Sequence, residues 1–236
     1  MSLQDAWAPI DEIADTGVDT FCYGVERGDG LFYPSQHGGR FGADIQPFEQ
    51  AAYWRTWHNM QSLIDQGLDP LRVLIDRAHA KGMDFIVSLR MGGFGGMDPS
   101  LRVANGGPGL GDPGVRAHQL KVLQELVEYP IEGIELDLAV PGGSRLIREG
   151  DSDAVRDAIT EYVEAIADLA RSKSMEIGAR VLPTEALNLS DGLDVREWLR
   201  RGLLDFTVPL RYGYMVLDPD LPLEWLVEAA HDSDSA

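Results

Sequence analysis

The 236-residue chain has little of several features that would identify other classes of protein. Its single cysteine, Cys22, excludes an internal disulfide and argues weakly for a reducing compartment. No apolar run approaches the roughly 18 residues that a membrane-spanning helix needs. The opening MSLQDAW has neither a basic start nor an apolar stretch, so no signal peptide is visible. The compartment stays open: cytoplasmic by default, or secreted if a native signal has been removed.

Lysine is scarce as well. Only three of the 20 basic residues are lysines, and 39 acidic residues bring the formal net charge to −19. Such an acidic protein repels phosphate backbones, so nucleic acid is not an expected partner. No lysine lies in a predicted strand, which disfavours a Schiff-base aldolase. His58, His79 and His118 fall on predicted helices, which leaves a metal-dependent amidohydrolase without ligands. We therefore expect no cofactor and no metal.

What the chain does contain is a regular alternation of helix and strand. Segments rich in β-branched and aromatic residues predict strands at 18–25, 84–91, 131–140, 176–182 and 205–211. Helical periodicity and caps predict helices at about 3–16, 49–66, 69–81, 112–130, 152–172, 194–202 and 223–230. In the first of these, Pro9 fits only if the regular helix begins near Trp7 or Ala8. This alternation indicates right-handed βα units around a parallel sheet.

Connections from helix to strand are short, whereas connections out of strands are long and often rich in glycine. In a (β/α) barrel the long loops at the C-terminal face carry the site. A doubly wound open sheet is the alternative, although no tight glycine-rich turn joins the first strand to a helix. A closed barrel needs eight strands and only five are recognised. We predict the α/β class: a TIM-type (β/α) barrel, partial, as one domain over 1–236 of a possibly longer chain, with a disordered tail at 231–236.

The predicted strand at 131–140, IEGIELDLAV, carries two carboxylates in an apolar frame. Glu135 and Asp137 are two residues apart, so their side chains point to the same face of the sheet. A buried carboxylate costs several kcal/mol unless it is paired or serves a purpose. Asp137, near the C-terminal end of the strand, is the first candidate for a catalytic or sugar-binding group, and Glu135 lies one layer deeper. Both could instead belong to an interior ion-pair network.

Four segments carry a resemblance to a known family: VDTFCYGVERGD, DPLRVLIDRAHAKGMDFIVSLRM, IEGIELDLAV and LDVREWLRRGLLDFTVPL. They resemble an uncharacterised group of glycoside-hydrolase-like (β/α)8-barrel proteins over residues 3–214. This resemblance implies that the five strands are the second to sixth of the barrel.

A weaker similarity runs to chitinase-like family 18 barrels. Their Ser-x-Gly-Gly motif would correspond to Ser88 with Gly92-Gly93, and their D-G-x-D-x-D-x-E motif to EGIELDLA. The last glutamate of that motif is the family's general acid, and Ala139 stands in its place. The similarity therefore implies the fold and the substrate class, but not the chitinase mechanism.

A glycosidase usually needs a second carboxyl group. Glu185, just past the fourth predicted strand, is a candidate for it beside Glu135. The arginines near strand ends either balance the acids or bind an acidic group on a substrate; they are Arg90, Arg180 and Arg211. Tyr23 and Tyr212 lie on or beside the long loops, where aromatic faces suit sugar rings.

These observations predict hydrolysis of a glycosidic bond in an oligo- or polysaccharide, through paired carboxylates at the C-terminal face of a barrel. The expected partner is a carbohydrate, and neither nucleic acid nor a membrane. Two alternatives remain: a carbohydrate-binding barrel that has lost its acid, which Ala139 supports, and a barrel fragment without activity of its own. The sugar, the stereochemical outcome and the oligomeric state stay open.

Overall fold

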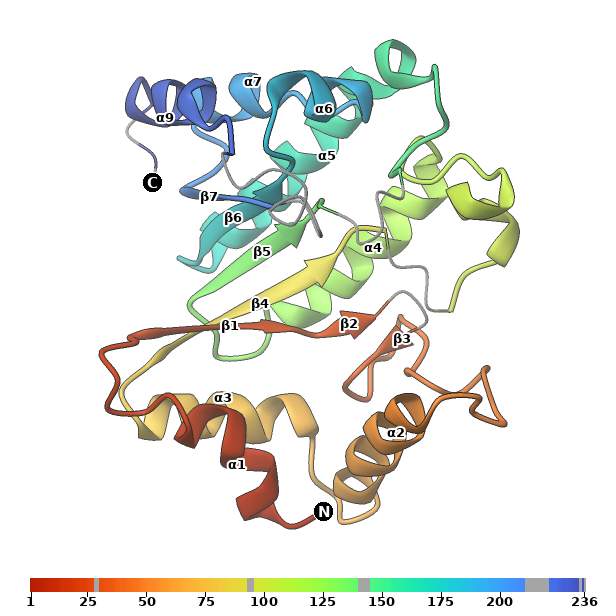
Figure 1. The fold of residues 1–236 in the computed structure, drawn as a ribbon, viewed down its shortest axis with the longest axis vertical. Helices are drawn as coiled ribbons and strands as arrows, with labels where there is room; N and C mark the ends of the chain where they lie inside the picture. The colour runs from red at the N-terminus through yellow and green to blue at the C-terminus, as the bar shows by residue number, and fades with distance from the viewer. Residues whose placement is uncertain (28–29, 93–95, 140–144, 211–220, 234, 236) are drawn as a thin grey trace.

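The structure of the protein, a computed structural model, describes residues 1–236 except 28–29, 93–95, 140–144, 211–220, 234 and 236 (Figure 1). Its centre is a parallel sheet in the order β1-β4-β5-β6-β7. The strands are β1 (Thr20–Gly24), β4 (Asp84–Arg90), β5 (Gly133–Asp137), β6 (Glu176–Val181) and β7 (Phe206–Pro209). Spatial order follows chain order, as in successive βα units of a barrel. The predicted α/β class is confirmed, and the sheet is that of a partial (β/α) barrel.

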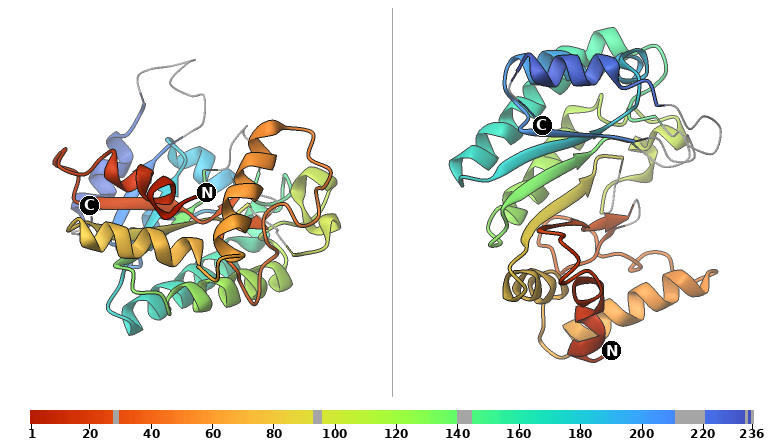
Figure 2. Two further views of the ribbon diagram at one scale, coloured as in Figure 1. Left: turned by 90° about the horizontal axis from the view of Figure 1, so that it is seen from below. Right: turned by 60° about the vertical axis from the view of Figure 1, so that its left-hand side comes forward.

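Helices cover one face and the two sides of this sheet. They are α1 (Leu3–Asp11), α2 (Ala51–Ile64), α3 (Pro70–Ala80), α4 (Pro113–Leu126), α5 (Ser152–Ser172), α6 (Glu185–Ser190), α7 (Val195–Arg200) and α9 (Glu224–His231). Figure 2 shows α4 and α5 side by side on one face of the sheet, and the two helices pack on each other. None of the described helices is long and apolar enough to cross a membrane.

Helix starts follow the predicted chemistry. The side chain of Asp69 accepts hydrogen bonds from the amides of the first turn of α3, and Asp112 does the same for α4; in both helices proline follows the cap. The prediction for Pro9 is wrong, because α1 begins at Leu3 and contains Pro9 in its interior. A reciprocal pair of hydrogen bonds between Ser2 and Asp5 starts this helix earlier than the proline suggested.

The hydrophobic core lies between the sheet and these helices. Alternate residues of the central strands point into it, among them Val87, Leu89, Ile134 and Leu136, none of them more than 1% exposed. We call this side the outer face of the sheet. Apolar side chains are required on a strand face that helices cover. Their burial stabilises the folded chain by roughly 25 cal/mol per Å² of apolar surface removed from water.

Several short elements were not expected from the sequence. The predicted loop after the first strand contains a small antiparallel hairpin of β2 (Glu26–Arg27) and β3 (Gly30–Leu31). The helix α6 follows β6 directly, and two single turns of 3-10 helix, η1 (Pro99–Leu101) and η2 (Val103–Asn105), lie in the long loop after β4. These elements are too short for a periodicity of 2 or 3.6 to show. In the predicted tail, α9 runs to His231 and the Ser235 hydroxyl donates to the Leu204 carbonyl.

Candidate functional site on the inner face of the sheet

The second face of the sheet carries polar side chains, and the strand register explains how they meet. Parallel pairing sets Ser88 level with Glu135, and Arg90 level with Asp137. The same register sets Asp137 level with Arg180 on the next strand. Side chains at one level of adjacent strands point the same way. These five side chains therefore form one group, and we call their side of the sheet the inner face.

Glu135 is held at the centre of this group. It is 1% exposed, and the Ser88 hydroxyl donates to its Oε1 at 2.6 Å. The Arg180 guanidinium contacts both of its oxygens, at 2.8 Å for Oε1 and 3.1 Å for Oε2. A hydroxyl donor and an arginine on one carboxyl group make charge-assisted hydrogen bonds that fix its position. Glu135 is thus built as a fixed buried carboxylate.

Asp137 lies at the C-terminal end of β5 in a different setting. It is 2% exposed; its Oδ2 is 3.4 Å from Arg90 Nε and 4.0 Å from Arg180 Nη1. Its Oδ1 has no hydrogen-bond partner among the described residues. Burial raises the pKa of the Asp137 carboxyl, although Arg180 and Arg90 both oppose the shift. Asp137 therefore keeps its proton to a higher pH than an ordinary aspartate.

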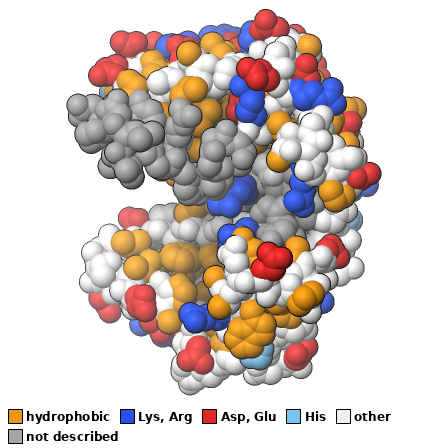
Figure 3. All heavy atoms as spheres, turned by 45° about the vertical axis from the view of Figure 1, so that its right-hand side comes forward, with side chains coloured by type: hydrophobic (Ala, Val, Ile, Leu, Met, Phe, Trp, Pro, Cys, Tyr) orange, Lys and Arg blue, Asp and Glu red, His pale blue; other side chains and the backbone are white. Residues whose placement is uncertain are grey.

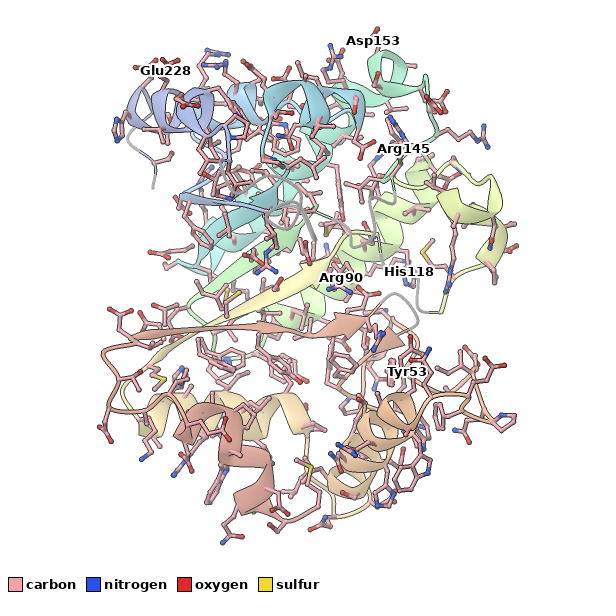
Figure 4. The ribbon with its side chains drawn as sticks, viewed as in Figure 1. Tyr53, Arg90, His118, Arg145, Asp153 and Glu228 are labelled. Carbon is pink, nitrogen blue, oxygen red and sulfur yellow. The ribbon has the colours of Figure 1, made fainter. Side chains whose placement is uncertain are left out.

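The arginines complete the inner face. Figure 4 shows Arg90 at the C-terminal end of β4, and Figure 3 shows basic side chains at a hollow between the two halves of the molecule. Arg180 forms ion pairs with both Glu135 and Asp137. Arg90 forms an ion pair with Asp137. Their side chains keep 25% (Arg90) and 22% (Arg180) of their surface exposed, so part of each guanidinium side chain faces solvent.

Other predicted site residues lie elsewhere. Glu185 begins α6 and makes two hydrogen bonds with Arg196, at 2.6 and 3.2 Å, which lower its pKa. No contact in the described part of the chain joins Glu185 to Asp137. Tyr23 is on the outer face, level with Val87, where its ring lies near Phe21 and Phe85. Arg211 and Tyr212 fall outside the described residues.

Sequence reasoning noted Ser88 only as part of a motif and missed its role as the hydrogen-bond donor to Glu135. The register of the two strands is the signal that could have found it, since Ser88 and Glu135 each stand two positions before a charged residue at the strand end, Arg90 and Asp137. Ala139, just past the end of β5, is 1% exposed. Within the described residues, no group of three or more His, Cys, Asp or Glu side chains could hold a metal ion.

No protein-family model matches the chain, and no curated protein matches it. Among solved structures, it is similar to Group II chitinase catalytic domain 2 of Ostrinia furnacalis, with 13% identity, 76% of this chain and 49% of that chain covered, and a TM-score of 0.49. A Group IV chitinase of Ostrinia furnacalis in complex with allosamidin shares 13% identity, over 65% of this chain and 37% of that one, with a TM-score of 0.42.

A third similar structure is the spore cortex-lytic enzyme SleL of Bacillus megaterium QM B1551, with 14% identity, 58% of this chain and 29% of that chain covered, and a TM-score of 0.39. The chain thus spans between 29% and 49% of the length of these proteins. Solved structures similar to the chain include chitinases, the type that the sequence resemblance named. The described strands themselves form the parallel sheet of a partial (β/α) barrel.

Proposed function

We propose that the chain hydrolyses a glycosidic bond of an oligo- or polysaccharide at the inner face, with Asp137 as the general acid. One observation carries this proposal. Asp137 is a buried carboxyl group at the C-terminal end of a barrel strand, with one oxygen unpaired among the described residues and a raised pKa. A general acid must hold a proton near neutral pH and have an oxygen free to reach the leaving group.

Glu135 is the second carboxyl group of the proposal. It is two residues from Asp137 on the same strand face, which separates the two Cα atoms by roughly 6–7 Å. Ser88 and Arg180 bind the Glu135 carboxyl group, whereas burial raises the pKa of Asp137, so the two acids stand in different surroundings. Such a difference between two neighbouring carboxyl groups is how enzymes divide acid and base roles. Glu185 is less suited to the role, because Arg196 already occupies both of its oxygens.

Arg90 and Arg180 would serve substrate binding in this proposal. Each guanidinium contacts a carboxylate and also keeps part of its side chain exposed. A guanidinium group can donate to sugar hydroxyls or pair with an acidic group on the sugar.

A second function, carbohydrate binding without hydrolysis, is favoured by Ala139. Its buried methyl group stands where chitinase-like barrels carry their general acid. In this alternative the arginines neutralise Glu135 and Asp137, and the inner face binds a sugar without cleaving it.

The test is the release of reducing sugar from a panel of polysaccharides, at low and high salt. Asp137→Asn should lower the rate by about 10²–10⁴-fold, the usual contribution of a general acid. Glu185→Gln is the matched control, because it removes a carboxylate that lies outside the inner face, and its rate should stay at the wild-type level. Retained hydrolysis in Asp137→Asn would exclude the assignment. A folded wild type that binds but releases no sugar would support the binding function instead.

A further inference from the structure

A second hollow lies on α2 and its preceding loop, formed by residues other than those of the inner face. Its volume is about 610 Å³, within the range of small-molecule sites. It is lined by Gln46, Pro47, Phe48, Gln50, Ala51, Trp54, Trp57 and His58. We call this hollow the aromatic pocket. Figure 3 shows an apolar surface beside a histidine in the lower part of the molecule, the part to which α2 belongs in Figure 1.

Aromatic rings form the walls of this pocket. Trp54 is 54% exposed and lies parallel to His58, with ring centroids 5.1 Å apart and an angle of 8° between the planes. Phe48 and Trp57 form a second pair, with centroids 6.2 Å apart. Both tryptophans fall on a helix, where a large apolar side chain ordinarily packs into the core, yet Trp54 remains exposed. A tryptophan kept half in water loses hydrophobic stabilisation, which is reasonable where the ring meets a ligand.

The rings are held in place before any ligand arrives. Gly42 has a φ of +82°, and a Cβ atom there would lie 2.7 Å from the Trp57 ring and 3.0 Å from the Phe48 ring. The loop therefore packs its bare backbone directly against both rings. The Arg40 guanidinium lies 4.9 Å from the centroid of Trp57, and Gln46 donates to the Gly42 carbonyl at 3.2 Å. Fixed rings lose little conformational entropy on binding, which favours affinity.

The chemistry of the lining indicates the class of ligand. Among the described residues that line the pocket there is no aspartate, glutamate, lysine or arginine, in a chain with a net charge of −19. The guanidinium of Arg40 lies against the Trp57 ring but does not belong to this lining. What the pocket offers is flat apolar ring faces with the amides of Gln46 and Gln50 beside them. Neutral pyranose rings match this combination, because their C–H faces pack on aromatic rings and their hydroxyls pair with amides.

We propose that the aromatic pocket is a binding site for a neutral polysaccharide chain, separate from the inner face. It would hold the polymer against the protein whether or not the inner face cleaves it. The proposal does not rest on the hydrolysis proposed above. It requires only that Trp54 and its neighbours form the binding surface.

The experiment measures depletion of the protein from solution by two insoluble neutral polysaccharides, chitin and cellulose. Trp54→Ala should weaken binding to at least one of them by about tenfold, the loss expected for one stacked ring. Trp54→Phe keeps a ring face and should recover part of that loss. Val227→Ala is the matched control, because Val227 is an apolar side chain exposed to 49% on α9, and its binding should equal the wild type.

Three results would overturn the proposal: wild-type protein that binds neither polymer, Trp54→Ala that binds like the wild type, or Val227→Ala that loses as much as Trp54→Ala. Melting temperatures of all variants should agree within a few degrees, since Trp54 and Val227 are exposed. Hydrolysis of a short soluble oligosaccharide separates the two proposals. Trp54→Ala should leave such hydrolysis unchanged if it occurs, whereas Asp137→Asn should abolish hydrolysis and leave polymer binding in place.

Discussion

The two faces of the strand β5 are both buried and are chemically opposite. Leu136 is fully buried on the outer face among helices, while its neighbours Glu135 and Asp137 are 1% and 2% exposed on the inner face. The outer face is stabilised by apolar area, which is roughly additive and tolerates exchange of similar residues. The inner face depends on each polar atom having a specific partner, because an unpaired buried charge costs several kcal/mol.

This difference shows where the molecule gains stability and where it gives some up. On the inner face, Asp137 Oδ1 has no hydrogen-bond partner among the described residues, and burial raises the pKa of that carboxyl group. Natural proteins carry such costs mainly where activity needs them. If the two faces are stabilised in these different ways, substitutions on them should lower the free energy of unfolding for different reasons. These effects on stability can be measured without any substrate.

The largest effect is expected from Arg180→Met. This change removes the guanidinium that contacts Glu135 at 2.8 Å and Asp137 at 4.0 Å, and leaves two buried carboxyl groups with less compensation. We expect the free energy of unfolding to fall by about 3–5 kcal/mol at neutral pH, the usual cost of removing one partner of a buried ion pair. Urea denaturation followed by circular dichroism measures it.

Two controls accompany Arg180→Met. Arg196→Met removes the partner of Glu185, in a pair whose side chains are 42% and 37% exposed, and should cost at most about 1 kcal/mol. The double variant Arg180→Met with Glu135→Gln should recover much of the loss, because it removes the carboxylate that the single change leaves unpaired. A loss that the double variant does not recover would mean that Arg180 acts by packing alone.

Leu136→Ala on the outer face should cost about 3 kcal/mol, within the range for truncating a fully buried leucine. The reason is lost apolar burial and a cavity, so the loss should not depend on pH. The loss in Arg180→Met should shrink in acid, because burial raises the pKa of Asp137 and that carboxyl group takes up its proton as pH falls. Chemical denaturation at pH 4 and pH 7 measures both. Parallel pH dependence in the two variants would contradict the distinction between the faces.

Much of the fold could be predicted from the sequence, because strands and helices leave a periodic pattern. The predicted helix at 152–172 has the bounds of α5, and the alternation of Leu136 with its acidic neighbours gave β5 its two faces. Pro9 was misjudged because a local capping box outweighed the preference of proline for a helix start. The short elements β2, β3 and α6 span too few residues for a periodicity of 2 or 3.6 to show, although their contacts are local: β2 pairs with β3, and Thr184 caps α6.

The candidate site could be predicted only in part. Glu135 and Asp137 were visible because acids inside an apolar strand are unusual, and Arg90 and Arg180 because they stand at strand ends. The register between the strands decides which of these side chains contact one another, and this register cannot be predicted from a single sequence. The exposure of Trp54 could not be predicted for a similar reason. The sequence of a helix shows which residues are apolar, but it does not show which of them another part of the chain covers.

The smallest effect, and the sharpest test of the comparison, is the pH dependence of Asp137→Asn. Burial raises the pKa of Asp137 in the folded chain above its ordinary value of 3.8. The folded state then binds this proton more tightly than the unfolded state. The stability linked to the proton is fully present below about pH 3.8 and is lost as pH rises through the raised pKa. Asparagine carries no such proton, so Asp137→Asn should melt at the same or a higher temperature than wild type at pH 7.

Thermal melts of the two proteins between pH 4 and pH 7 test this expectation. The difference between Asp137→Asn and wild type should shrink toward pH 4, because the raised pKa of Asp137 makes a growing fraction of that carboxyl group protonated, and so uncharged like asparagine, as pH falls. Asp191→Asn is a useful control, because burial raises the pKa of that carboxyl too, while Arg145 rather than the inner face pairs with it. An Asp137→Asn variant that is clearly less stable at pH 7 would mean that Arg90 and Arg180 outweigh burial. The inner face would then be a stabilising ion-pair network, and the argument that it gives up stability for function would fail.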